Sequence, residues 1–381
     1  MENYSKKYMF LRRILISNFK NIREADIVFS PKINAITGNN GEGKTNLLDA
    51  VYYLSMCKSY FNTSDTYTCT FGSDGFALNG TYLNEDSTEE TIGVALKQGG
   101  AKTVRRNGKQ YQRMSDHIGV IPIVMVSPSD TMLVNGAGEE RRRFANALLS
   151  QVDREYLRRI QRYNQFLAQR NRLLKSDAVS GELLETISER MSPDAAYIYR
   201  RRKELCRQLQ ELMVSVYDKV SGGKDTVSLK YVSVLERRME EGEGDGALLS
   251  LFEENAGKDA VLKYTSAGVQ RDDIEFFING HHVRRCASQG EQKSFLISLK
   301  LAQFSLVRRI HGMAPILLLD DLFDKLDMNR VQLLMRLVAG DGFGQIFITD
   351  SNKVRVGQIA GAVSSEVSFF KVSNGEIYEK E

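Results

Sequence analysis

The segment 38–45 constrains the fold of this chain more than any other, because it has the complete spacing of a phosphate-binding P-loop. Its residues are Gly38, Asn39, Asn40, Gly41, Glu42, Gly43, Lys44 and Thr45. An apolar segment (33–36) precedes it and an amphipathic segment (46–54) follows it, which predicts the strand–loop–helix unit that P-loops need. In that unit, backbone N–H groups and the helix N-terminus bind phosphate oxygens, Lys44 reaches the β- and γ-phosphates, and the Thr45 hydroxyl holds Mg²⁺. The chain is therefore predicted to bind a nucleoside triphosphate.

The composition indicates a globular intracellular protein. With 381 residues, 42% of them apolar, the chain can form one large or two modest domains. Its four cysteines have neither disulfide-framework nor zinc-site spacing, which favours reduced thiols. No apolar run approaches the length of a membrane helix, and the N-terminal residues lack a signal-peptide core. We expect a cytoplasmic protein with no membrane association.

Hydrophobic periodicity divides the chain into three parts. Residues 10–110 have strand-like alternation, with turn signals at Gly99-Gly100 and Asn107-Gly108 that suggest an antiparallel meander. From about 139 to 220 the apolar period becomes helical, and strand signals return after 260. The prediction is an α/β protein in which both ends of the chain build one domain around an inserted helical lobe. The expected segments are 1–115, 116–258 and 259–381.

Four local predictions follow from turn and cap signals. Ser192-Pro193 is expected to begin a helix, since serine is a good N-cap and proline a good first helical residue. Residues 239–247 are expected to form a solvated loop. Asn279-Gly280 predicts a type I′ hairpin turn, followed by a helix over 291–310.

A buried-type run, 316–319, ends in Asp320-Asp321 and resembles a Walker B strand. Asp320 at the strand tip would hold Mg²⁺ opposite Thr45, and Asp321 would polarise the attacking water as a general base. A buried strand that ends at a helix cap is the structural alternative. A complete P-loop in the same chain favours catalysis, so Lys44, Asp320 and Asp321 are the predicted catalytic residues.

The segment 288–293 (Ser-Gln-Gly-Glu-Gln-Lys) carries two interpretations. Ser288 followed three residues later by Glu291 has the spacing of a helix-capping box. A hydroxyl and backbone N–H groups at a helix N-terminus also form an anion site, with Ser288 and Gly290 directed at a phosphate. The same geometry serves both purposes. Asp327 is, by default, the N-cap of a helix predicted over 328–337.

Positive charge is concentrated in the segment 139–175. It holds ten basic residues and four acidic ones, a net charge of +6 in a chain whose overall net charge is +4. Such a face is the electrostatic footprint of nucleic-acid binding, although a solvated helix face with internal ion pairs would have the same composition. The candidate DNA contacts are Arg141, Arg142, Arg143, Arg158, Arg159 and Arg162.

The order of these motifs resembles that of ABC-type ATPases of the SMC class, and more closely the RecF family of bacterial replication and repair proteins. The resemblance covers nearly the whole chain. Besides the P-loop, the segment 288–293 and Asp320-Asp321, it rests on Asn18-Phe19-Lys20-Asn21, Ser127-Pro128-Ser129-Asp130, Arg141-Arg142-Arg143-Phe144, Gln169-Arg170-Asn171 and Arg271-Asp272-Asp273. The chain departs from the family pattern at Asn62, at Ala145-Asn146 and at Gln270. Thr349-Asp350-Ser351 ends the last core strand without a switch histidine, so no switch role is assigned to Asp350.

The resemblance implies an ABC-type ATPase head, with a mixed sheet, an antiparallel β subdomain and an inserted helical lobe. It implies that ATP joins two protomers into a homodimer, with Ser288 and Gly290 binding the γ-phosphate in trans and Asp327 between the two sites. It further implies a weak, DNA-stimulated ATPase that binds DNA at gaps and single-strand/double-strand junctions. RecF proteins work with RecO and RecR to load RecA, in replication, recombinational repair and the SOS response.

Two other classes share some of these motifs. A transporter nucleotide-binding subunit also has a P-loop, a signature segment and a Walker B strand, but here the intervening lobe is basic rather than suited to a membrane partner. An ATP-binding scaffold with little hydrolysis is the other alternative, because the presence of motifs does not establish turnover.

Overall fold

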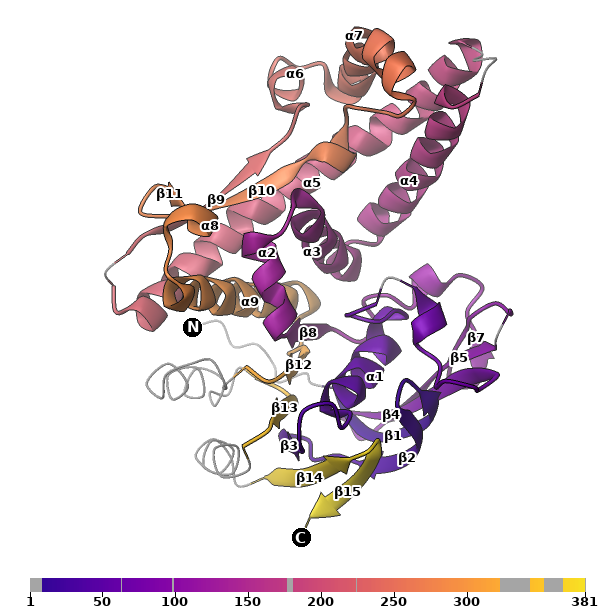
Figure 1. Cartoon of the computed structure of the whole chain (residues 1–381), viewed down its shortest axis with the longest axis vertical. Helices are drawn as coiled ribbons and strands as arrows, with labels where there is room; N and C mark the ends of the chain where they lie inside the picture. The colour runs from indigo at the N-terminus through magenta and orange to yellow at the C-terminus, as the bar shows by residue number, and fades with distance from the viewer. Residues whose placement is uncertain are drawn as a thin grey trace. The chain divides into compact units, whose positions relative to one another are not determined.

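The computed structural model describes residues 9–62, 64–97, 99–176, 181–223, 225–322, 343–352 and 366–380. The chain divides into two compact units (Figure 1). Unit 1 comprises residues 1–130, 219–223 and 293–381, and unit 2 comprises residues 131–218 and 224–292. Both ends of the chain therefore belong to unit 1, and most of unit 2 is an insertion into it. No helix among these described residues is both long enough and apolar enough to cross a membrane.

The boundaries of the insertion differ from the predicted 116–258. Strand β8 (Ile123–Val126) pairs in parallel with β12 (Ile316–Leu319), which keeps residues up to 130 in unit 1. At the other end, β10 (Asp273–Ile278) pairs antiparallel with β9 (Val227–Val232), which holds the chain in unit 2 up to residue 292. Strand pairing between distant segments set both boundaries, and changes in local composition did not reveal it.

The mixed sheet of unit 1 carries the P-loop strand at its centre. Its strand order is β15-β14-β3-β13-β12-β8, and every pair is parallel except β14–β15. The remaining strands are β3 (Ile33–Thr37), β13 (Ile346–Asp350), β14 (Val367–Ser373) and β15 (Glu376–Lys380). All residues of β3, β8, β12 and β13 are buried, as expected for parallel strands covered on both faces. Helix α1 (Lys44–Met56) packs its apolar side chains into this core.

The second sheet of unit 1 is an antiparallel meander with strand order β2-β1-β4-β5-β6-β7. Its strands are β1 (Met9–Phe19), β2 (Ile22–Val28), β4 (Gly75–Asn84), β5 (Glu89–Lys97), β6 (Thr103–Arg106) and β7 (Lys109–Gln110). Asn107 and Gly108 both have positive φ, as a type I′ turn requires. The predicted meander and its Asn-Gly turn are therefore confirmed.

Unit 2 is mainly helical, with a small antiparallel sheet of order β11-β10-β9. Its longest helices, α4 (Arg154–Leu174) and α5 (Gly181–Ser221), run side by side in Figure 1. The shorter elements are α2 (Thr131–Asn135), α3 (Gly138–Val152), α6 (Glu236–Glu240), α7 (Ala247–Leu262), β11 (His281–His282) and α8 (Val283–Cys286). Tyr156, Ile160 and Tyr163 are buried along α4, in agreement with the helical apolar period predicted for this part of the chain. Helix α9 (Gln289–His311) begins in unit 2, belongs to unit 1 from residue 293 onward, and covers the predicted 291–310.

The structure corrects two local predictions and confirms the Asn279-Gly280 turn. Ser192-Pro193 does not begin a helix, because α5 continues through it from Gly181. Ser192 donates its hydroxyl to the backbone carbonyl of Asp245 and is almost fully buried, so tertiary packing overrides the cap signal. The predicted loop 239–247 contains the end of α6 and the start of α7. The Asn279-Gly280 hairpin is present with both residues at positive φ, but its second strand is only two residues long.

Candidate nucleotide-binding site

The P-loop lies between β3 and α1, as the sequence predicts, and its glycines meet strict steric demands. Gly43 precedes the first helical residue with a φ of 119°, which side-chain-bearing residues rarely adopt. A Cβ on Gly38 would lie 2.4 Å from the carbonyl oxygen of Val372 in β14. The sheet therefore packs directly against the loop backbone, and only glycine fits at position 38.

Lys44 is held in place by neutral groups. Its ammonium group donates to the backbone carbonyls of Gly38 at 2.8 Å and Asn39 at 2.9 Å. The side chain is buried, and it forms no ion pair with a carboxylate within the described part of the chain. A buried cation without a counter-ion favours an anionic ligand. The position suits a phosphate bound over the loop.

The side chains of Glu42 and Asn21 stabilise the P-loop through hydrogen bonds. Glu42 accepts hydrogen bonds from the backbone N–H of Asn39 at 2.8 Å and from its side-chain amide at 2.9 Å. Asn21, which follows β1, donates to the Glu42 carbonyl at 3.0 Å and accepts from the Asn46 amide at 2.8 Å. The N–H of Gly375 donates to the same Glu42 carbonyl at 2.9 Å.

The role of Asn21 was missed in the sequence, where Asn18–Asn21 indicated only the first strand. A Cβ on Gly43 would lie 2.8 Å from the Asn21 amide group, so this side chain is packed tightly against the loop. No local pattern shows that residues 21, 42 and 375 meet. The asparagine in the turn after β1 was the available signal, since its side chain can satisfy backbone groups of a neighbouring loop.

Asp320 and Thr45, which are 275 positions apart in sequence, are brought together. The Thr45 hydroxyl donates to the Asp320 carboxylate, at 2.9 and 3.1 Å from its two oxygens. Thr349 at the end of β13 donates its hydroxyl to the same carboxylate at 2.9 Å. Thr349 was also missed, although it lies at the carboxyl end of a strand beside β12, where ligand-binding groups of parallel sheets gather.

Burial raises the pKa of Asp320 above its ordinary value, and the neighbouring Asp321 carboxylate adds to the rise. The hydroxyl hydrogen bonds from Thr349 and Thr45 oppose the shift without cancelling it. A nearby divalent cation would reverse this balance, because it favours the ionised carboxylate. The oxygen-only donor set of Thr45 and Asp320 fits Mg²⁺, which takes one or two protein oxygens together with phosphate oxygens.

Asp321 has a backbone conformation that asparagine and aspartate adopt far more often than other residues with side chains. Its φ is 43°, and its N–H donates to the Thr349 hydroxyl at 2.9 Å. Backbone outliers of this kind cluster at functional sites, where the surrounding structure holds them in place. Its location directly after Asp320 is consistent with the predicted general base.

The segment that begins at Ser288 forms the predicted capping box at the start of α9. The Ser288 N–H and hydroxyl both donate to the Glu291 carboxylate at 2.7 Å, and the Glu291 N–H donates back to the Ser288 hydroxyl at 3.3 Å. Ser288 is exposed and belongs to unit 2, whereas the P-loop belongs to unit 1. The phosphate-binding interpretation therefore stays a prediction. Asp327 and the helix predicted over 328–337 lie outside the described residues.

Two of the arginines predicted to bind DNA are engaged inside unit 2. Arg141 on α3 forms a bidentate ion pair with Asp273, at 2.7 and 2.8 Å. Arg142 donates to the backbone carbonyl of Asp272, and burial lowers the pKa of its guanidinium. The Asp272 carboxylate pairs at 3.2 Å with Arg202 of α5, and both side chains are almost fully buried. The two acids at the start of β10 thus tie α3 and α5 to the sheet.

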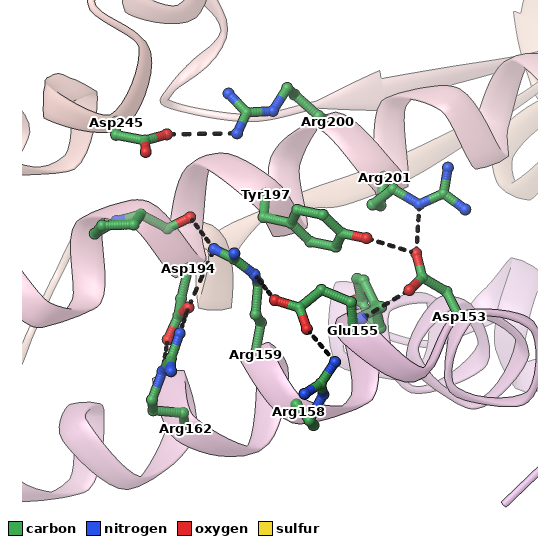
Figure 2. A network of polar contacts seen from close by, with 12 residues as sticks. Asp153, Glu155, Arg158, Arg159, Arg162, Asp194, Tyr197, Arg200, Arg201 and Asp245 are labelled. Carbon is green, nitrogen blue, oxygen red and sulfur yellow. Dashed lines mark hydrogen bonds and ion pairs between the residues drawn. The ribbon is translucent and has the colours of Figure 1, made fainter.

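The arginines of α4 form an alternating network of acids and bases (Figure 2). Glu155 pairs with Arg158 at 2.7 Å and with Arg159 at 2.5 Å. Asp194, fully buried on α5, accepts a bidentate contact from Arg162 at 2.7 and 2.5 Å. Arg158 and Arg162 keep more than half of their side-chain surface exposed, whereas Arg159 keeps about a quarter. On α3, Arg143 is also largely exposed and pairs with Glu139 and Glu140 at 3.3 Å.

Two departures from the family pattern also have structural partners. Gln270 accepts a hydrogen bond from the Tyr163 hydroxyl of α4 and donates to the carbonyl of Ala267, so it connects helix and loop within unit 2. The N–H of Asn62 donates to the Ser59 hydroxyl at 3.0 Å. Asp350 is fully buried and caps the N–H of Asn352 at 2.8 Å.

Comparison with known proteins agrees with this geometry. The RecF/RecN/SMC N terminal domain family matches residues 10–374. The "DNA replication and repair protein RecF" of Parabacteroides distasonis is 40% identical over 98% of the chain and 100% of that protein. A structure of the recombination mediator protein RecF-ATPrS in the RecFOR pathway covers 100% of both chains, with a TM-score of 0.88 and 27% identity. An Smc head domain from Pyrococcus furiosus, 15% identical, has a TM-score of 0.56 and covers 98% of this chain and 96% of that one, which shows a shared ATPase-head fold.

Proposed function

This chain belongs to the RecF family, and on that premise we propose that it is an ATP-dependent DNA-binding clamp of recombinational repair. The contact between Thr45 and Asp320 carries the nucleotide part of the proposal. It places a hydroxyl and a carboxylate from opposite ends of the chain beside a P-loop whose lysine is already directed by the loop backbone. Phosphate-binding and metal-binding oxygens meet there in the arrangement that P-loop ATPases use.

In the proposed site, ATP lies on the backbone of residues 38–45 with Lys44 at its β- and γ-phosphates. Thr45 and Asp320 would hold Mg²⁺, which would neutralise charge on the phosphate oxygens. Asp321 would orient and deprotonate the attacking water. Release of the hydrolysis products would end the ATP-dependent association of the protein. Slow hydrolysis, stimulated by DNA, would therefore act as a switch rather than as a metabolic step.

The other half of the site would come from a second protomer. Ser288 and Gly290 at the start of α9 would bind the γ-phosphate in trans, with Asp327 between the two sites. The exposed position of Ser288 at the N-terminus of a 23-residue helix supports this assignment, because a helix N-terminus attracts anions. ATP would then join a homodimer, since each phosphate is recognised by both copies.

DNA would bind unit 2 through its exposed arginines. Arg143, Arg158 and Arg162 retain accessible guanidinium surface and could exchange a carboxylate for a phosphate, whereas Arg141, Arg142 and Arg159 mainly hold the unit together. Binding of this kind is salt-sensitive and largely independent of sequence. We propose that the DNA is a gap or a single-strand/double-strand junction, and that the protein acts in the cytoplasm with RecO and RecR to assist RecA loading.

The decisive experiment follows oligomer size and DNA binding with and without ATP. Lys44→Ala should weaken ATP binding by about 30-fold or more, because a charge-assisted contact worth roughly 2 kcal/mol or more is lost. ATP-dependent dimers should then disappear in sedimentation velocity. Binding to gapped and plain duplex DNA is measured in parallel at two salt concentrations. Lys109→Ala, an exposed change on β7, is the matched control. Undiminished dimerisation of Lys44→Ala with ATP would overturn the clamp.

A further inference from the structure

A groove of about 360 Å³ lies between the C-terminal part of α4 and the N-terminal part of α5. Its floor is apolar and is made by Phe166 and Leu173 from α4 and by Leu183 and Ile187 from α5. Leu183 is 46% exposed, a high value for a leucine that lies beside other apolar side chains. The two helices thus leave an apolar strip open to solvent within unit 2.

Arginines from both helices border this strip. Arg172 from α4 and Arg190 from α5 line the groove, and both are exposed. Neither forms an ion pair with any other described residue, although Arg158, Arg162 and Arg170 of α4 all do. The lining includes no acidic residue. Two positive charges that pair with no carboxylate in the described part of the chain therefore border the groove.

We propose that this groove docks an acidic amphipathic segment of a partner protein, which inserts apolar side chains between α4 and α5. Carboxylates beside those side chains would pair with Arg172 and Arg190. Helix-in-groove recognition uses an apolar floor, and charges at the rim add specificity for a partner of opposite charge. Duplex DNA fits less well, because its phosphates would gain nothing from the apolar floor. The groove contains no residue of the nucleotide site. Binding of the segment there should therefore not require ATP, and the proposal can be tested independently of the clamp.

The test measures binding of two fluorescein-labelled helical peptides to the full chain, without nucleotide, by fluorescence anisotropy. The first peptide carries leucines along one face and glutamates beside them, and the second has lysines in place of the glutamates. The acidic peptide should bind in a salt-sensitive manner, and the lysine peptide should not. Arg172→Glu combined with Arg190→Glu should weaken binding of the acidic peptide by about tenfold or more, because attraction at the rim becomes repulsion.

Two further variants separate a docking site from general electrostatic attraction. Leu183→Ser removes part of the apolar floor at an exposed position and should weaken the acidic peptide by several-fold without lowering the melting temperature. Arg154→Glu reverses an exposed charge on the same helix, outside the groove, and should leave peptide binding unchanged. Equal binding of both peptides, or equal losses for Arg154→Glu and the double variant, would overturn the proposal. So would a double variant that loses gapped-DNA binding while retaining the acidic peptide, since the groove would then serve nucleic acid.

Discussion

The charged groups of the nucleotide site in unit 1 and the arginines of unit 2 are held in opposite ways. In unit 1, Lys44 donates to backbone carbonyls, and Asp320 accepts from the hydroxyls of Thr45 and Thr349. In unit 2, Arg141 and Arg162 pair directly with carboxylates. Neutral partners fix the position of a charge without cancelling it, whereas an opposite charge satisfies it. The first arrangement leaves the charge to act on a ligand, and the second mainly joins structural elements.

This difference predicts which property each substitution should change. Changes in the nucleotide site should affect ligand binding and turnover while leaving the fold intact. Changes at the paired arginines should affect stability in proportion to their burial. A nucleotide-site substitution that unfolds unit 1 would contradict this separation between effects on ligand binding and effects on stability.

The largest expected effect is on turnover, from Asp321→Asn. An amide cannot accept the proton of the attacking water, so ATP hydrolysis should fall by about 100-fold or more. ATP binding and the melting temperature should stay close to wild type, because Asp321 holds its backbone position through its N–H and the Thr349 hydroxyl. Turnover is measured by phosphate release and binding by calorimetry.

The variant also tests the alternative of a non-hydrolysing scaffold. If the clamp operates as proposed, Asp321→Asn should stay bound to DNA longer in ATP, since release depends on hydrolysis. Equal turnover and equal release from DNA in variant and wild type would instead favour an ATP-binding scaffold, and would remove Asp321 from the catalytic residues.

The next effect separates a half-buried arginine from an exposed one in unit 2. Arg141→Gln leaves the Asp273 carboxylate without its bidentate partner, so it should reduce the free energy of unfolding by roughly 3 kcal/mol. Arg158→Gln removes only one exposed partner of Glu155 and should cost less than about 0.5 kcal/mol. Urea denaturation of both variants checks this ordering.

DNA binding should rank these two variants in the reverse order. Arg158→Gln should weaken binding at low salt and reduce the salt-dependence slope by about one, as expected for one lost phosphate contact. Arg141→Gln, assayed at a temperature where it is folded, should keep the wild-type slope. A lower slope for Arg141→Gln than for Arg158→Gln would show that the Arg141–Asp273 pair opens to bind DNA.

The smallest effect is a gain in stability. Asp320→Asn removes a buried negative charge, while the amide oxygen can still accept from Thr45 and Thr349. Without nucleotide, this variant should be more stable than wild type by about 1–2 kcal/mol near neutral pH, and it should lose Mg²⁺-dependent ATP affinity. Thermal melts with and without Mg-ATP measure both changes.

The pH dependence of that gain follows from the raised pKa of Asp320. Because the folded pKa lies above the unfolded value, the folded state binds the proton more tightly, and ionisation destabilises it. The penalty is absent below the unfolded pKa and is complete once the pH exceeds the folded pKa. The advantage of Asp320→Asn should therefore shrink as the pH falls through that interval. An advantage that grows toward acid pH would contradict the assignment of the shift to burial.

The nucleotide site was largely predictable from sequence, because local spacing determines it. The P-loop, its strand and its helix occupy one short segment, and a strand that ends in two acids was sufficient to locate Asp320. Thr349 and Asn21 were not predictable. Their roles depend on which strands become neighbours and on a turn that packs against Gly43, and one sequence does not specify either contact.

The contacts of the basic segment 139–175 were much less predictable from sequence than the nucleotide site. Its composition correctly indicated a concentration of arginines on α3 and α4, but the partners of Arg141 and Arg162 lie far away in sequence. Asp273 is 132 positions from Arg141, and Asp194 is 32 positions from Arg162. Composition counts charges without pairing them, so it could not separate the arginines that hold unit 2 together from those that remain exposed. Pro193 illustrates the same point for helix boundaries, since burial on both sides of it outweighs a strong local signal.

The bond from the Gly375 N–H to the Glu42 carbonyl has a consequence for synthesis of the protein. The P-loop emerges early from the ribosome, but the strand that carries Val372 against Gly38, and the turn that braces Glu42, are translated more than 300 residues later. Domains that fold during translation generally begin at the N-terminus, yet this nucleotide site cannot be completed until residue 375 has left the exit tunnel. Nascent chains should therefore have no competent ATP site, and unfinished copies should not join finished ones through nucleotide.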